Sequence, residues 1–157
     1  MTDRKPPGTA AGEKATLVGF LDYLREAIAA KATGVPEPQV RTPGVPSGTS
    51  LLGLVKHLTA VERFYFLGDE VRSWPATFKP TTNDTVDGVL AGYRQAVAEA
   101  NAVIAVCDDL GRPVPSPPKS RPAPSLRWLL THMIEETGRH AGQADILREL
   151  IDGATGR

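Results

Sequence analysis

Four segments of this 157-residue chain repeat apolar residues at the three- and four-residue spacing of an amphipathic helix. No segment alternates apolar and polar residues as a half-buried strand would. The helical segments are expected at residues 13–32, 50–67, 85–106 and 125–152. In the first of them Leu21, Leu24 and Ile28 share one face, and Gly153 follows the last as a helix-ending residue. Four helices with long connections predict an all-α fold, a four-helix bundle.

The linkers between these segments are rich in turn residues. The third linker has six prolines between Pro113 and Pro124, which predicts an extended, partly polyproline-like segment. Its position beside the last helix makes it a candidate lid. The second linker carries two aromatic residues, Trp74 and Phe78, which we expect at a pocket mouth or a dimer interface.

Length and charge narrow the class of protein. The chain (1–157) suits one domain with a core at about 13–153 and a flexible segment at 1–12. Its 18 basic and 18 acidic residues cancel, which favours neither nucleic acid nor an anionic membrane as a partner. Its apolar runs fall short of the ~20 residues of a membrane span. The single cysteine, Cys107, excludes an internal disulfide and fits a cytoplasmic location.

The last helical segment places His132, Glu136 and His140 at four-residue spacing. Glu136 and His140 fall within the apolar stripe that contains Leu129 and Leu147, whereas His132 lies toward its edge. A carboxylate on a buried face is costly unless a charge, a metal or hydrogen bonds compensate it. Residues eight apart are separated by about 12 Å along a helix, so His132 and His140 cannot bind one ion together. The pair Glu136 and His140 is therefore favoured over His132 and Glu136.

The one further histidine, His57, also falls on the core face of its helix. His57 with Glu136 and His140 would form a three-ligand set with open positions, the pattern of catalytic rather than structural zinc sites. The alternative is that the histidines are core residues bonded to backbone carbonyls. Glu136 would then form a buried ion pair with one of three arginines: Arg63, Arg127 or Arg139. The residues alone leave both interpretations open.

Two stretches, "SLLGLVKHLTAVERFYF" and "LRWLLTHMIEETGRHAGQADILRELIDG", resemble the DinB/YfiT-like superfamily of metal-binding four-helix bundles. The commonest form of that family has His-x-x-x-His on the last helix, where this chain has Glu136 and His140. The His–Glu–His variant is similar to the mycothiol-dependent maleylpyruvate isomerase branch. The whole-chain pattern, over about 13–153, is closer to a short actinobacterial subfamily associated with mycothiol S-transferase activity.

The resemblance implies that His57, Glu136 and His140 hold a divalent metal ion, zinc in first place, although such a set also accepts nickel, iron or manganese. It implies a detoxifying transferase in which a metal-activated small-molecule thiol, mycothiol, attacks an electrophile. The chain lacks the additional C-terminal domain of the isomerase, which argues against maleylpyruvate isomerisation. Three further residues are candidates to orient a ligand or contact the thiol: His132, Gln143 and Arg148.

Other functions remain open from the sequence. A metal-dependent hydrolase would need a free general base, and Glu62 and Glu135 point away from the ligand faces of their helices. A metal-binding bundle without catalysis would favour a fourth protein ligand, and none is apparent. The chain could also be an interaction module, and a homodimer is compatible with any of these functions.

Overall fold

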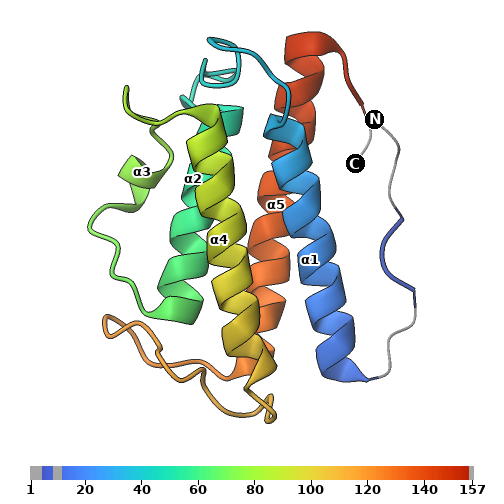
Figure 1. The fold of residues 1–157 in the computed structure, drawn as a ribbon, viewed down its shortest axis with the longest axis vertical. Helices are drawn as coiled ribbons and strands as arrows, with labels where there is room; N and C mark the ends of the chain where they lie inside the picture. The colour runs from blue at the N-terminus through green and yellow to red at the C-terminus, as the bar shows by residue number, and fades with distance from the viewer. Residues whose placement is uncertain (1–4, 9–11, 156–157) are drawn as a thin grey trace.

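The structure is a computed structural model that describes residues 5–8 and 12–155. The described chain is all-helical and contains no strand, as the sequence predicts. Its elements are α1 (Glu13–Ala32), α2 (Leu51–Glu62), the π-helical η1 (Arg63–Leu67), α3 (Trp74–Thr77), α4 (Val86–Ala105) and α5 (Leu126–Asp152). The four long helices run side by side in a bundle (Figure 1). The prediction of coil for the second linker is partly wrong, because this linker contains the one-turn helix α3.

The helix boundaries follow from local capping chemistry. Three helices begin after a hydroxyl residue whose side chain accepts a backbone N–H of the first turn: Ser50, Thr85 and Ser125. The η1 segment and α5 end at Gly68 and Gly153, whose φ angles of 75° and 73° favour glycine. These signals are visible in the sequence, which is why the predicted ranges match closely.

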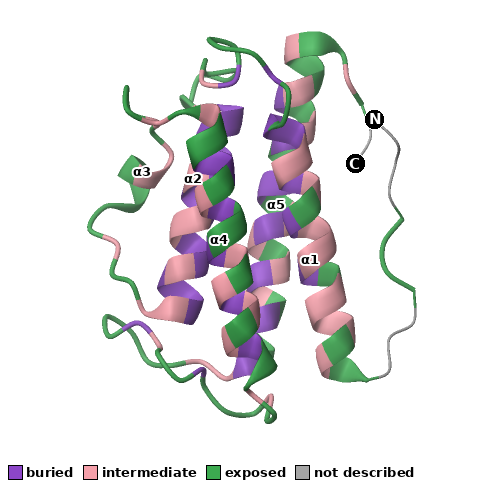
Figure 2. Ribbon diagram, in the orientation of Figure 1, coloured by how far each residue is buried: buried purple, intermediate pink, exposed green. Residues whose placement is uncertain are grey.

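The bundle consists of two helix pairs. The most extensive packing joins α1 to α5 and α2 to α4, whereas contacts between the pairs are fewer. Buried residues, coloured purple in Figure 2, lie on the inward faces of the helices. One apolar cluster includes Leu54 and Leu58 of α2, and a second includes Phe66 with Leu130 and Met133 of α5. None of the helices in the described chain combines the length and apolar character needed to cross a bilayer.

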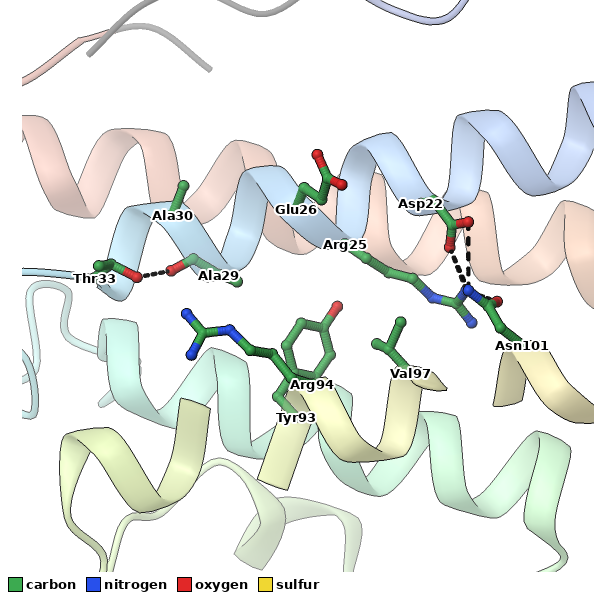
Figure 3. Close-up of a pocket in the computed structure, with 10 residues that line it drawn as sticks. All are labelled: Asp22, Arg25, Glu26, Ala29, Ala30, Thr33, Tyr93, Arg94, Val97 and Asn101. Carbon is green, nitrogen blue, oxygen red and sulfur yellow. Dashed lines mark hydrogen bonds and ion pairs between the residues drawn. The ribbon is translucent and has the colours of Figure 1, made fainter. Parts of the chain in front are cut away.

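A buried ion pair connects the two helix pairs. The Arg25 guanidinium of α1 donates to both carboxylate oxygens of Glu62 at the end of α2, at 2.7 and 2.6 Å. It also donates to Asp22 and to the amide oxygen of Asn101 on α4 (Figure 3). Burial alone would lower the pKa of Arg25, but the Glu62 carboxylate outweighs this effect and raises it. Arg25 and Glu62 are therefore a charged pair inside the bundle.

A cleft of about 730 Å³ opens between α1 and α4 beside this ion pair. Figure 3 shows Tyr93 of α4 with its hydroxyl directed toward α1. That side chain is 1% exposed, and its hydroxyl has no hydrogen-bond partner among the described residues. Burial raises its pKa well above 10, so the group is a neutral phenol.

Candidate metal centre

Three side chains converge between α2 and α5. His57 comes from the middle of α2, and Glu136 and His140 are one turn apart on α5. The Oε1 atom of Glu136 lies 3.2 Å from His57 Nε2 and 3.2 Å from His140 Nε2. All potential ligand atoms of the set lie within 4.8 Å of one another. The structure therefore brings together the three residues that the resemblance implies.

The outer nitrogen of each imidazole is held by a defined partner. Thr77 donates its hydroxyl proton to the Trp74 carbonyl at 2.6 Å, so its oxygen is left to accept from His57 Nδ1 at 2.7 Å. The amide oxygen of Gln143 lies 2.8 Å from His140 Nδ1 and accepts its proton. In its neutral form each imidazole therefore carries the proton on Nδ1 and directs the Nε2 lone pair toward Glu136. Carbonyl or hydroxyl acceptors behind a histidine are typical of metal ligands.

The surroundings of His57 and Glu136 shift the pKa of each group. Burial lowers the pKa of His57, and nearby His140 adds to the shift, while Glu136 opposes it. Burial alone would raise the pKa of the Glu136 carboxyl, but the two facing imidazoles lower it overall. At neutral pH the Glu136 carboxylate is thus ionised and faces the Nε2 atoms of both imidazoles. Without a proton or a metal ion between them, these three electron-pair donors repel one another.

The spacing between Glu136 and each histidine fits a metal ion. Zinc bonds to histidine nitrogen and carboxylate oxygen at about 2.0–2.2 Å, so a tetrahedral ion separates two such ligand atoms by about 3.3 Å. The two Nε2–Oε1 distances of 3.2 Å match that value. The donor set of two imidazoles and one carboxylate leaves at least one coordination position for another molecule.

A cavity of about 370 Å³ adjoins the three residues. Its lining is mainly aromatic and basic: His57, Val61, Phe64, Tyr65, Trp74, Phe78, Arg121, His132, Glu136, Arg139 and His140. The Phe78 ring stacks on His57 with centroids 3.7 Å apart, and Trp74 approaches the same imidazole edge-on. These rings shield the ligand face of α2 from water and fix the orientation of His57.

The other residues singled out by the sequence lie in three different places. His132 lines the cavity and stacks on Trp128 with centroids 4.9 Å apart, outside the ligand set. Gln143 contacts His140, as expected for a residue that orients a ligand. Arg148 instead donates to the Lys31 carbonyl at 2.9 Å, at the far end of α1 and α5, and does not line the cavity. Its location does not suit the contact with the thiol that the sequence suggested.

The arginines considered as ion-pair partners of Glu136 form ion pairs with other carboxylates. Arg63 pairs with Asp69, and Arg127 pairs with Glu13. Arg139 approaches the outer oxygen of Glu136 only at 3.9 Å. A buried ion pair with one of these arginines therefore does not explain the position of Glu136.

Sequence reasoning missed two residues that shape this site. Thr77 fixes His57 but lies in a one-turn helix too short to show periodicity. Arg121 reaches the cavity from the proline-rich linker, whose path a sequence pattern does not specify. In the sequence, Thr77 was marked only by its position between Trp74 and Phe78. Arg121 was marked only by its position among the prolines of the third linker.

Comparison with known proteins agrees with this geometry. The sequence model of a family described as Mycothiol-S-transferase matches residues 16–153, which include all three candidate ligands. The chain belongs to the mycothiol-S-transferase family. No curated protein matches the chain. Membership of the mycothiol-S-transferase family supports thiol transfer at the level of the family. The candidate metal centre is the part of the structure where this chemistry can be tested.

Proposed function

We propose that this member of the mycothiol-S-transferase family is a metal-dependent thiol S-transferase whose His57, Glu136 and His140 hold a divalent ion, zinc in first place. The observation that carries the proposal is the convergence of three potential ligands, with Glu136 Oε1 3.2 Å from both Nε2 atoms and a hydrogen-bond acceptor behind Nδ1 of each ring. A bound ion would supply positive charge that keeps a coordinated thiol ionised at neutral pH.

The residues around the ligands prepare the site for this reaction. Thr77 and Gln143 hold the imidazoles in the tautomer that presents Nε2 to the centre. Phe78 and Trp74 exclude water from one side of the site. The adjoining cavity of about 370 Å³ leaves room for the electrophile beside the ligands. Attack by the thiol requires no nucleophile from the protein, and Cys107 is not among the residues that line the cavity.

Hydrolysis is the less favoured reaction because a free carboxylate to act as general base is not found among the described lining residues. Glu135 is paired with Arg139 on the surface of α5. Glu62 is fully buried in its ion pair with Arg25. Glu136, the remaining carboxylate of the cavity, belongs to the ligand set.

The test begins with elemental analysis of the purified, untagged protein and of two variants, Glu136→Ala and Glu135→Ala. We expect about one metal ion per chain in the wild type and in Glu135→Ala, which removes a neighbouring carboxylate outside the set. Glu136→Ala should lose the metal. Mycothiol consumption with an added electrophile should then require the metal. A wild-type protein that stays metal-free after incubation with zinc and nickel would refute the proposal. A metal-loaded protein that consumes ester substrates without thiol would favour the hydrolase.

The subsidiary expectations stay predictions of the same proposal. They are mycothiol as the thiol, a cytoplasmic location, a homodimer, and a single domain spanning residues 1–157.

A further inference from the structure

An arginine of the proline-rich linker lies at the edge of the cavity with a fixed position. The Glu70 carboxylate accepts the backbone N–H groups of Lys119 and Ser120, at 2.9 and 3.2 Å, and so ties the linker to the segment after η1. The next residue, Arg121, donates from Nη1 to the Tyr65 hydroxyl at 2.6 Å. Its guanidinium carbon lies 5.4 Å from the Tyr65 ring centre and 5.9 Å from that of Trp128.

The partners of this guanidinium are neutral. Within residues 5–8 and 12–155, Arg121 forms no ion pair, so its charge is not compensated by a carboxylate. The other arginine of the cavity, Arg139, is paired with Glu135. The one carboxylate in the cavity lining is Glu136, which the metal would engage. Arg121 is thus a positioned, uncompensated cation beside the proposed reaction centre.

We propose that Arg121 binds a carboxylate of the electrophile, so that the substrate attacked by the thiol is an anion with a flat apolar body. A guanidinium presents parallel N–H donors that match a carboxylate, and most donors of Arg121 are left free by its single bond to Tyr65. The proposal rests on the proposed transferase function and names the substrate class of the same site.

The anion is assigned to the electrophile rather than to the thiol because of the chemistry of each. Mycothiol presents sugar and acyl groups and has no carboxylate, and its sulfur must face the three ligands. The apolar part of the electrophile has matching walls in the rings of Phe64, Trp74 and Phe78, which line the same cavity. A planar body between these rings and a carboxylate at Arg121 would use both kinds of surface.

The transfer can be followed with 4-(chloromethyl)benzoate. The ionised sulfur forms a C–S bond to the benzylic carbon, the C–Cl bond breaks, and chloride leaves with the bonding pair. The thiol proton passes to solvent before the attack. Arg121 holds the carboxylate and takes part in no bond change.

The experiment compares 4-(chloromethyl)benzoate with its uncharged methyl ester in wild type, Arg121→Gln and Arg112→Gln, with mycothiol saturating. Arg112 is a matched control in the same linker, with a side chain that is 83% exposed. We expect the wild type to prefer the acid in kcat/KM by about tenfold to a hundredfold, the usual range for a charged hydrogen bond. Arg121→Gln should abolish this preference by raising KM for the acid much more than KM for the ester, and Arg112→Gln should retain the preference. Equal use of acid and ester by the wild type, or equal losses for both in Arg121→Gln, would overturn the proposal.

A binding measurement separates this proposal from the transferase function. Unreactive 4-methylbenzoate is titrated into each protein without thiol, with tryptophan fluorescence as the readout and 4-methylbenzamide as the uncharged control. We expect Arg121→Gln to weaken benzoate binding about tenfold or more and Arg112→Gln to leave it unchanged. A carboxylate held by the metal centre instead would bind equally well in all three proteins and refute the role of Arg121. If neither 4-(chloromethyl)benzoate nor its methyl ester is consumed but Arg121→Gln weakens benzoate binding, the anion site is supported. The transferase function then fails for these electrophiles.

Discussion

The buried ion pair between α1 and α2 gives the most direct test of how this bundle is held together. Arg25 and Glu62 are 2% and 0% exposed and share two hydrogen bonds of 2.7 and 2.6 Å. Glu62→Gln keeps the side-chain volume but removes the negative charge. The Arg25 guanidinium would then keep only Asp22 and Asn101 as partners.

The expected loss of stability follows from the burial of both groups. Removing one partner of a buried pair typically costs about 3–5 kcal/mol, and here Arg25 would keep only its ion pair with the more exposed Asp22. For a chain of this size each kcal/mol corresponds to roughly 2–4 °C in the melting temperature. We therefore expect Glu62→Gln to melt roughly 6–20 °C below the wild type, with the same direction of change in the urea midpoint at pH 7.

Two further variants control the interpretation. Glu37→Gln removes the partner of Arg41 in an exposed pair, and should cost far less stability because solvent screens such pairs. The double variant Arg25→Met with Glu62→Leu replaces both charges by apolar groups and should recover most of the loss. A loss in Glu62→Gln no larger than that in Glu37→Gln would refute the reasoning, as would a double variant no more stable than Glu62→Gln.

Four other predictions concern single positions. Tyr93→Phe removes a buried hydroxyl without a described partner and should raise the free energy of unfolding by about 1 kcal/mol in urea titrations; a loss would mean that the hydroxyl is bonded. Thr77→Val removes the acceptor behind His57 and should weaken zinc binding about 10- to 100-fold in competition with a chelator, with secondary structure unchanged. Gly53→Ala would place a methyl group against the Phe78 carbonyl, so we expect a lower melting temperature together with weaker zinc binding; an unchanged protein would contradict this packing. Burial depresses the pKa of His57 in the folded state below 6.5, so the unfolded chain binds more protons as the pH falls through that value. Metal-free protein should therefore lose stability below about pH 6.5, and His57→Gln should flatten this dependence in urea titrations at several pH values.

The helices could be predicted because their determinants are local. The apolar spacing, the hydroxyl caps and the terminal glycines are all read within a few residues of each boundary. The one-turn helix α3 and the π-helical η1 are too short to produce a periodic signal. The proximity of Glu136 and His140 was also local, since residues four apart are neighbours on any helix.

The remaining part of the site depends on tertiary arrangement. The sequence placed His57 on an inward face, but its approach to Glu136 depends on which face of α2 meets α5. Arg121 depends on the path of a linker with no regular structure, which is set by contacts such as those of Glu70. One sign of the buried pair of Arg25 and Glu62 is visible in the sequence, since Arg25 lies between the apolar positions of its helix.

The position of the candidate ligands within the bundle would give a bound metal ion a structural role as well as a chemical one. The main packing lies within the α1–α5 and α2–α4 pairs, and polar bridges cross between them. Arg25 and Glu62 connect α1 to α2, and the ligand set connects α2 to α5. The first bridge is complete by itself because opposite charges meet. The second brings a carboxylate and two imidazole nitrogens together, and a metal ion between them would join α2 to α5. Such a site would require little rearrangement to accept an ion, because the packed bundle already orders the ligands.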